Sequence, residues 1–116
     1  IESMPSTLEG KVLCDWSKEN IQGADFAGPL ALDLILSRQA AAIKGVKENR
    51  VSGRANGIIV PDIVSGNALF KSLVYLSGGC AAGLVIGARV PLILTSRADP
   101  PAARLASIAL ASISQS

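Results

Sequence analysis

The sequence predicts an α/β protein in which short aliphatic strands alternate with helices around a parallel sheet. Two runs, residues 57–60 and 90–95, are apolar and rich in β-branched residues, and each passes directly into polar residues. Such runs are typical of strands that are buried on both faces of a parallel sheet. Only four residues are aromatic. We therefore expect a core of Leu, Ile, Val and Ala.

Length and composition set the class of protein. A chain of 116 residues has the size of one domain. It begins Ile-Glu-Ser without an initiator methionine, so we expect it to be part of a longer protein. The longest uncharged run, residues 72–88, contains four glycines and is too short for a membrane span, and no signal-peptide pattern opens the chain. These features predict a cytoplasmic protein with no membrane partner.

Charge and residue types exclude several functions. Eleven basic and nine acidic residues leave a net charge of +2, and no aromatic residues alternate with the basic ones, so we expect no nucleic-acid partner. The chain contains no histidine, which excludes Ser-His-Asp and Cys-His catalysis within it. Cys14 and Cys80 lack the paired spacing of a zinc site. We expect two reduced thiols and no metal.

Helical spacing and capping residues place four helical segments. The first runs from Pro5 or Thr7 to about Glu19, with a capping box formed by Ser6 and Glu9. A second segment covers residues 31–42 and restarts at Ser37, which can cap the following turn. The third covers residues 63–77. The last has Asp99 as its N-cap and Pro100 as its first residue. The faces expected to be buried are Leu8, Val12, Leu13 and Trp16 in the first helix, Leu69, Phe70, Leu73, Val74 and Ser77 in the third, and Leu105, Ile108, Ala109 and Ile113 in the last.

Polar residues gather where each predicted strand ends, which is where open parallel sheets bind their ligands. Asp62, Gly66 and Asn67 follow the first strand and open a helix, whose N-terminus suits an anion. Capping alone explains Asp62 about as well as ligand binding does. Gly66 in the first turn of a helix costs stability, so close approach of a ligand or of a neighbouring backbone would account for it.

Arg97 follows the second predicted strand, immediately after Ser96. A guanidinium between a buried strand and a helix start needs an anionic partner. The carboxylate of Asp99 and a phosphate in a cleft are equally good partners on the residues alone.

Three further features can be explained either by ordinary local structure or by ligand binding. Asp25 and Asp33 flank a predicted strand end and turn at residues 24–30, where a solvated turn or cap position is favoured over a ligand contact. The loop 44–54 is mildly basic. A phosphate-bearing cofactor could use it, but a solvated, mobile loop is the better interpretation.

Several short motifs together resemble the phosphate acetyltransferase and phosphate butyryltransferase family. They cover nearly the whole chain and occur in the family's order: MPST (4–7), GPLALD (28–33), AAAIKG (40–45), VPD (60–62) with SGN (65–67), YLSGG (75–79), GARVP (87–91) and TSRAD (95–99). The GPLALD and SRAD forms look closer to the butyryl-type branch.

The resemblance implies an acyltransferase that moves an acyl group reversibly between coenzyme A and phosphate. It also implies a homodimer that uses coenzyme A and phosphate as substrates and binds no permanent cofactor. The implied fold is a three-layer, parallel-sheet α/β fold like that of isocitrate and isopropylmalate dehydrogenases. The chain then looks like the C-terminal part of a two-domain enzyme, with residues 1–82 as the later half of the second domain and residues 83–116 returning to the first. Such a fragment is expected to be inactive by itself.

The same resemblance assigns roles to individual residues. Ser96 and Arg97 match the family's Ser-Arg pair, which implies binding of phosphate or acyl phosphate. Asp62, Gly66 and Asn67 match the motif that lines the cleft. Acetyl-type members have an aspartate six positions after the arginine, where this chain has Ala103. Asp99 is therefore the remaining candidate base, although we favour it as a helix cap that orients Arg97.

Two alternatives compete with this function. One is the acyl-carrier-protein phosphate acyltransferase of lipid synthesis, which has a similar glycine-asparagine turn but fits the SRAD segment less well. The other is a non-catalytic α/β module that keeps the motifs as scaffold.

Overall fold

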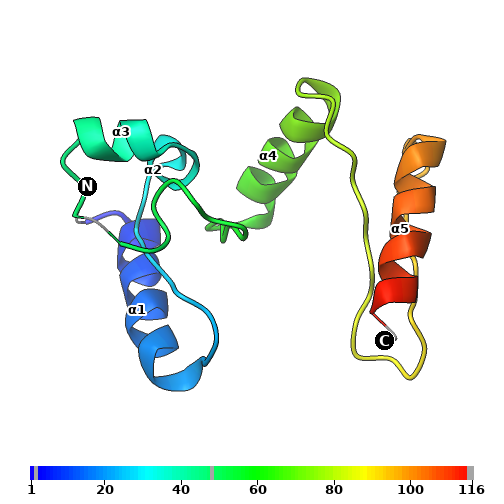
Figure 1. Ribbon diagram of the computed structural model, residues 1–116, viewed down its shortest axis with the longest axis horizontal. Coiled ribbons are helices and arrows are strands. Elements are labelled where there is room, and N and C mark those ends of the chain that lie inside the picture. The colour runs from blue at the N-terminus through cyan, green and yellow to red at the C-terminus, as the bar shows by residue number, and fades with distance from the viewer. Residues whose placement is uncertain (2, 48, 115–116) are drawn as a thin grey trace. The chain divides into compact units, whose positions relative to one another are not determined.

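The computed structural model describes residues 1, 3–47 and 49–114, and its regular elements are helices (Figure 1). They are α1 (Pro5–Asn20), α2 (Leu32–Leu36), α3 (Arg38–Ile43), α4 (Ile63–Tyr75) and α5 (Pro101–Ile113). Their contacts divide the chain into an N-terminal unit, Ile1–Gly66, and a C-terminal unit, Asn67–Ser116. In the described part of the chain, no helix combines the length and the apolar character that crossing a bilayer requires.

The two predicted strands are not formed in the described residues. Residues 57–60 and 90–95 are irregular, and the β-pairing is a single antiparallel bridge in which the Val85 N–H donates to the Leu92 carbonyl at 2.8 Å. The side chains of Ile59 and Leu94, expected to be buried, are 66% and 76% exposed. A strand needs neighbouring strands to satisfy its backbone groups, and this part of the chain does not supply them. The predicted parallel sheet is therefore absent from these residues.

Helix α1 confirms the predicted helix but not the predicted cap. It begins at Pro5, with Met4 as N-cap and without a side-chain capping bond, so the capping box of Ser6 and Glu9 was wrong. Proline suits the first helical position, because its fixed φ is already helical and its missing N–H would have had no partner within the helix. The prediction that the apolar face of this helix is buried was also wrong, because Leu8, Val12 and Trp16 are each more than half exposed.

The break between α2 and α3 was predicted correctly. Ser37 ends α2 and is the N-cap of α3, where its hydroxyl accepts a hydrogen bond from the Ala40 N–H at 3.1 Å. This bond satisfies one of the backbone donors that every helix start leaves unpaired. The two short helices therefore pack as a pair joined at one residue.

Helix α4 begins where a carboxylate caps it. The Asp62 Oδ1 atom accepts a hydrogen bond from the Ser65 N–H at 2.7 Å. That bond is the main reason why the pKa of Asp62 lies below its ordinary value of 3.8. A Cβ on Gly66 would come within 2.9 Å of the Val60 Cγ2 atom. Close approach of the preceding segment therefore accounts for this glycine without a ligand.

Helix α5 buries small residues rather than the predicted large ones. It begins at Pro101 with Pro100 as N-cap, so the assignment of Asp99 as N-cap was wrong. Leu105, Ile108 and Ile113 are 69%, 52% and 71% exposed. The buried positions recur every four residues, at Ala103, Ser107 and Ala111.

Ser107 attaches α5 to a distant segment of the C-terminal unit. Its side chain is fully buried, its hydroxyl donates to the Ala103 carbonyl at 2.8 Å, and its Oγ atom accepts from the Gly83 N–H at 3.0 Å. A Cβ on Gly83 would lie 3.3 Å from the Leu94 carbonyl oxygen, so two extended segments and one helix meet here. The small residues of α5 allow this approach.

The capping role of Asp62 predicts a pH-dependent contribution to stability. Because the pKa of Asp62 is lowered in the folded protein, its stabilising effect is present above the ordinary pKa of 3.8 and is lost as the pH falls through the lower folded value. We expect Asp62→Asn to reduce the free energy of unfolding in urea at pH 7 and to have a smaller effect at pH 3. Glu9→Gln serves as the control for loss of an exposed carboxylate. An effect of Asp62→Asn that grows toward pH 3 would contradict the capping role.

The Ser107 bonds predict a specific cost for removing one hydroxyl. We expect Ser107→Ala to lower the free energy of unfolding by about 1–3 kcal/mol, because the Gly83 N–H loses its partner in a partly buried site. Ser112→Ala is the matched control, because Ser112 makes the same bond to the carbonyl four residues earlier, at 3.0 Å, but lies exposed and accepts from no distant residue. Equal losses for the two variants in urea denaturation would show that the bond to Gly83 contributes nothing.

Candidate active site

Ser96 and Asp99 close a tight turn at the end of the second apolar segment. The Asp99 Oδ2 atom accepts from the Ser96 N–H at 2.7 Å, and the Asp99 N–H donates to the Ser96 carbonyl at 3.1 Å. The Ser96 hydroxyl accepts from the Ala98 N–H at 3.5 Å. Each end of the turn therefore fixes the other, and Arg97 lies between them.

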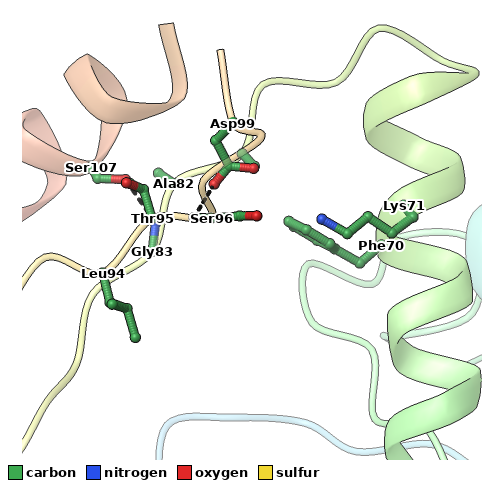
Figure 2. Close-up of a pocket in the computed structure, with 10 residues that line it drawn as sticks. Phe70, Lys71, Ala82, Gly83, Leu94, Thr95, Ser96, Asp99 and Ser107 are labelled. Atoms are coloured by element: carbon green, nitrogen blue, oxygen red, sulfur yellow. Dashed lines mark hydrogen bonds between the residues drawn. The ribbon is translucent and has the colours of Figure 1, made fainter. Parts of the chain in front are cut away.

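The same turn lines a pocket of about 260 Å³ in the C-terminal unit (Figure 2). Side chains from both ends of the turn, Ser96 and Asp99, reach it, and so do Phe70 and Lys71 from α4. In Figure 2 the Ser96 hydroxyl and the Lys71 ammonium point toward one another. The buried Ser107 hydroxyl and Gly83 form part of its wall. A hydroxyl, a cation and a carboxylate therefore share one opening.

Lys71 is the pocket residue that sequence reasoning missed. Its Nζ atom lies 5.2 Å from the centroid of the Phe70 ring and 5.8 Å from that of Tyr75, distances at which ring and cation attract. No carboxylate of the described residues forms an ion pair with it. A signal for it existed in the sequence, because Lys71 is the only charged residue between Ile63 and Ala88.

Arg97 differs from its predicted setting. It was expected at the exit of a buried strand, but its side chain is exposed and does not line the pocket. Within the residues described, it forms no ion pair, so Asp99 is not its partner. The Asp99 carboxylate instead accepts a hydrogen bond from the Ser96 N–H. The prediction that Asp99 orients Arg97 through a direct contact was therefore wrong. The guanidinium is free to bind an anion from solvent.

The remaining predicted site residues are divided between the two units. Asp62 and Gly66 belong to the N-terminal unit, where a helix cap and the close approach of the Val60 side chain account for them. Asn67 is the first residue of the C-terminal unit and is exposed on α4. The structure brings together Ser96, Asp99 and Lys71 around one pocket, and Asn67 does not line it.

This arrangement suits an anionic ligand. Lys71 supplies positive charge in the pocket, and the Ser96 hydroxyl can donate a hydrogen bond to an oxyanion there, while the exposed guanidinium of Arg97 lies outside the lining. Among the residues that the structure describes, no group of three or more His, Cys, Asp or Glu side chains is placed to hold a metal ion. Cys80 is exposed and Cys14 half-buried, and both are free thiols.

The sequence matches the family described as phosphate acetyl/butaryl transferase over residues 3–112. A phosphate acetyltransferase of Rhizobium meliloti is 47% identical over 111 residues, which are 95% of this chain and 35% of that protein. A phosphate butyryltransferase of Clostridium acetobutylicum is 41% identical over 111 residues, which are 95% of this chain and 36% of that protein. The chain thus spans about a third of the length of these relatives.

The structure is similar to the crystal structure of a branched-chain phosphotransacylase from Enterococcus faecalis V583. The TM-score is 0.81 at 34% sequence identity, and the match covers 97% of this chain and 40% of that one. The helices and the irregular segments between them therefore follow the path of a solved enzyme, which is consistent with part of an α/β enzyme. Because the same stretch matches the family, its curated members and a solved structure, this chain belongs to the phosphate acetyltransferase and phosphate butyryltransferase family.

Proposed function

We propose that the whole protein transfers an acyl group between coenzyme A and inorganic phosphate. A phosphate oxygen attacks the thioester carbonyl, the C–S bond breaks, and the products are acyl phosphate and the coenzyme A thiolate, which then takes up a proton. Membership of the family supports this reaction. The observation that carries it in the structure is the Ser96–Asp99 turn, which places a hydroxyl beside a cation-lined pocket.

Within this proposal, Arg97 and Ser96 hold the phosphate or acyl phosphate. Arg97 is exposed and lacks an ion pair among the described residues, so its guanidinium can form two parallel hydrogen bonds to an oxyanion. Positive charge that is in place before reaction stabilises the charge that develops on the carbonyl oxygen. Asp99 positions the turn through the Ser96 N–H. In the reverse direction, where the coenzyme A thiol attacks acyl phosphate and releases phosphate, the second carboxylate oxygen of Asp99 is our candidate acceptor for the thiol proton; in the forward direction the same group, once protonated, returns that proton to the thiolate.

We also propose that Asp62, Gly66 and Asn67 contribute to substrate binding in the whole protein. The N-terminal end of α4 supports this, because its capped start carries the positive end of a helix dipole. Capping accounts for Asp62 and close approach of Val60 accounts for Gly66, so Asn67 is the residue of the three whose presence a substrate contact would explain.

The finer features of the fold are part of the same proposal. Residues 1–82 would form the later half of one domain of a three-layer, dehydrogenase-like enzyme, and residues 83–116 would return to the other. The exposed aliphatic side chains support the view that the chain is part of a larger fold. Side chains such as those of Ile59 and Leu94 become buried only if further strands and helices cover them. We further propose a cytoplasmic homodimer that binds acyl-CoA and phosphate and holds no permanent cofactor.

The role of Arg97 is tested by measuring phosphate-dependent thiol release from acetyl-CoA and butyryl-CoA with the full-length enzyme. We expect Arg97→Ala to raise the KM for phosphate by about tenfold or more, because a charge-assisted hydrogen bond is lost. Arg97→Lys should retain part of the affinity, and Arg104→Ala, which removes an exposed arginine of α5, should change the KM for phosphate less than twofold.

An Arg97→Ala enzyme with unchanged phosphate dependence would remove this role. Activity of the wild type with an acyl-carrier protein but not with acyl-CoA would favour the enzyme of lipid synthesis. No turnover with either donor would favour a non-catalytic module.

A further inference from the structure

Lys71 has different surroundings from the other cations of the C-terminal unit. The basic residues of this unit are Lys71, Arg89, Arg97 and Arg104. The three arginines are exposed and lie outside the lining of the pocket in Figure 2, whereas Lys71 is half-buried and lines it. A charge that gives up part of its contact with water needs partners that compensate for the loss. The partners of Lys71 therefore decide whether its charge is balanced within the unit.

The C-terminal unit offers Lys71 a single acidic side chain. It is Asp99, because the sequence from Asn67 to Ser116 contains no other aspartate or glutamate. Asp99 lines the same pocket, but its Oδ2 atom accepts a hydrogen bond from the Ser96 N–H at 2.7 Å. In the described part of the chain, Asp99 and Lys71 form no ion pair. Within its own unit, the ammonium group is therefore left without a carboxylate partner.

Two aromatic rings hold the ammonium group in place. The Lys71 Nζ atom lies 5.2 Å from the centroid of the Phe70 ring and 5.8 Å from that of the Tyr75 ring. The faces of such rings attract a cation but do not use its three N–H donors as a carboxylate would. The charge is thus positioned in advance and can still donate hydrogen bonds to an anion, which lowers the cost of binding one.

We propose that Lys71 binds the same phosphate as Ser96, or the phosphoryl group of the acyl phosphate in the reverse reaction. The inference rests on the proposed function and adds a binding residue to it. In Figure 2 the Lys71 ammonium group and the Ser96 hydroxyl point toward one another, from α4 and from the turn, so an anion between them meets both. The pocket of about 260 Å³ has room for a phosphate, since one water molecule occupies roughly 30 Å³ in the liquid.

The charges of the pocket explain why a phosphate there requires Lys71. The charged side chains of the lining are Lys71 and Asp99. Without Lys71, a phosphate would meet the like charge of Asp99 alone, which is unfavourable. The ammonium group offsets this repulsion and donates to a phosphate oxygen. The thioester that phosphate attacks is uncharged, so Lys71 acts on phosphate and acyl phosphate rather than on the acyl-CoA.

The test uses the full-length enzyme and three variants. Lys71→Met removes the charge but keeps a flexible side chain against the rings, and Lys71→Arg keeps the charge. Arg104→Met is the matched control, because Arg104 is also a helical cation of this unit but lies exposed and outside the lining. Affinity for inorganic phosphate is measured by calorimetric titration. Thiol release and thiol consumption give the KM values for phosphate, acetyl phosphate, acetyl-CoA and butyryl-CoA. Circular dichroism and melting temperature establish that each variant is folded, and Lys71→Gln provides the test if Lys71→Met is not.

We expect Lys71→Met to weaken the binding of phosphate and acetyl phosphate by about tenfold or more, since a charge-assisted hydrogen bond is lost. Its KM for either acyl-CoA should stay within about twofold of the wild-type value. Lys71→Arg should retain part of the phosphate affinity, which a purely steric role of the side chain would not produce. Arg104→Met should change each of these values less than twofold.

Three results would overturn the inference while leaving the proposed function standing. Unchanged phosphate affinity in a folded Lys71→Met enzyme would show that the ammonium group contacts no phosphate. A rise in the KM for acyl-CoA without one for phosphate would assign Lys71 to the coenzyme A substrate. An equal loss in Arg104→Met would show that only the overall charge of the unit matters. Failure of the wild type to release thiol from any acyl-CoA would instead contradict the proposed function, whereas Lys71-dependent binding of phosphate by calorimetry would still support the role of Lys71.

Discussion

A single buried hydroxyl, that of Ser107, organises the C-terminal unit. In the described residues, two extended segments lie beside α5 without a sheet to satisfy their backbone groups, and one antiparallel bridge joins them. Ser107 supplies an acceptor to the Gly83 N–H at the point where Gly83 approaches the Leu94 carbonyl. Because the segment through Leu94 leads directly into the turn from Ser96, the position of that turn depends on a residue of α5 whose hydrogen bonds go to Gly83 and Ala103 instead. The N-terminal unit uses the same principle with an amide, since Asn49 satisfies two backbone donors of its own loop.

Local signals in the sequence predicted the helix caps at Ser37 and Asp62 correctly, but the capping box of Ser6 and Glu9 and the N-cap at Asp99 incorrectly. The caps at Ser37 and Asp62 each involve a backbone N–H three residues later, so the chemistry of a few neighbouring residues decides them. The buried faces were predicted poorly for the opposite reason. Helical spacing shows which residues share a face, but burial depends on what that face meets, and this chain spans about a third of its relatives. On α5 the close approach of other segments selected Ala103 and Ser107 over the larger Leu105 and Ile108.

In the candidate site, too, the sequence predicts the residues that are neighbours in the chain and misses the one that the fold brings to them. Ser96 and Asp99 could be predicted from adjacent motif residues, and the structure joins them in one turn. Their partner Lys71 is 25 residues before Ser96 in the sequence, and no motif connects the two, so only the fold brings it to the pocket. The sequence gives charge but not pairing: five cations look alike from Arg38 to Arg54, and only the structure shows that Asp33 and Asp25 pair with two of them, Lys44 and Arg50.

The two cysteines differ in a way that affects how such a protein is handled. Cys80 is exposed and immediately precedes Ala81, which lines the pocket, whereas Cys14 is half-buried, and a Cβ on Gly28 would lie 3.3 Å from its sulfur atom. Alkylating agents and disulfide dyes act on accessible thiolates, so they modify Cys80 before Cys14. A chromogenic reagent that detects newly released thiols therefore also reacts with the protein, and it attaches a bulky group next to the pocket residue Ala81. The same selectivity makes Cys80 a natural position for a fluorophore that reports on ligands entering that pocket.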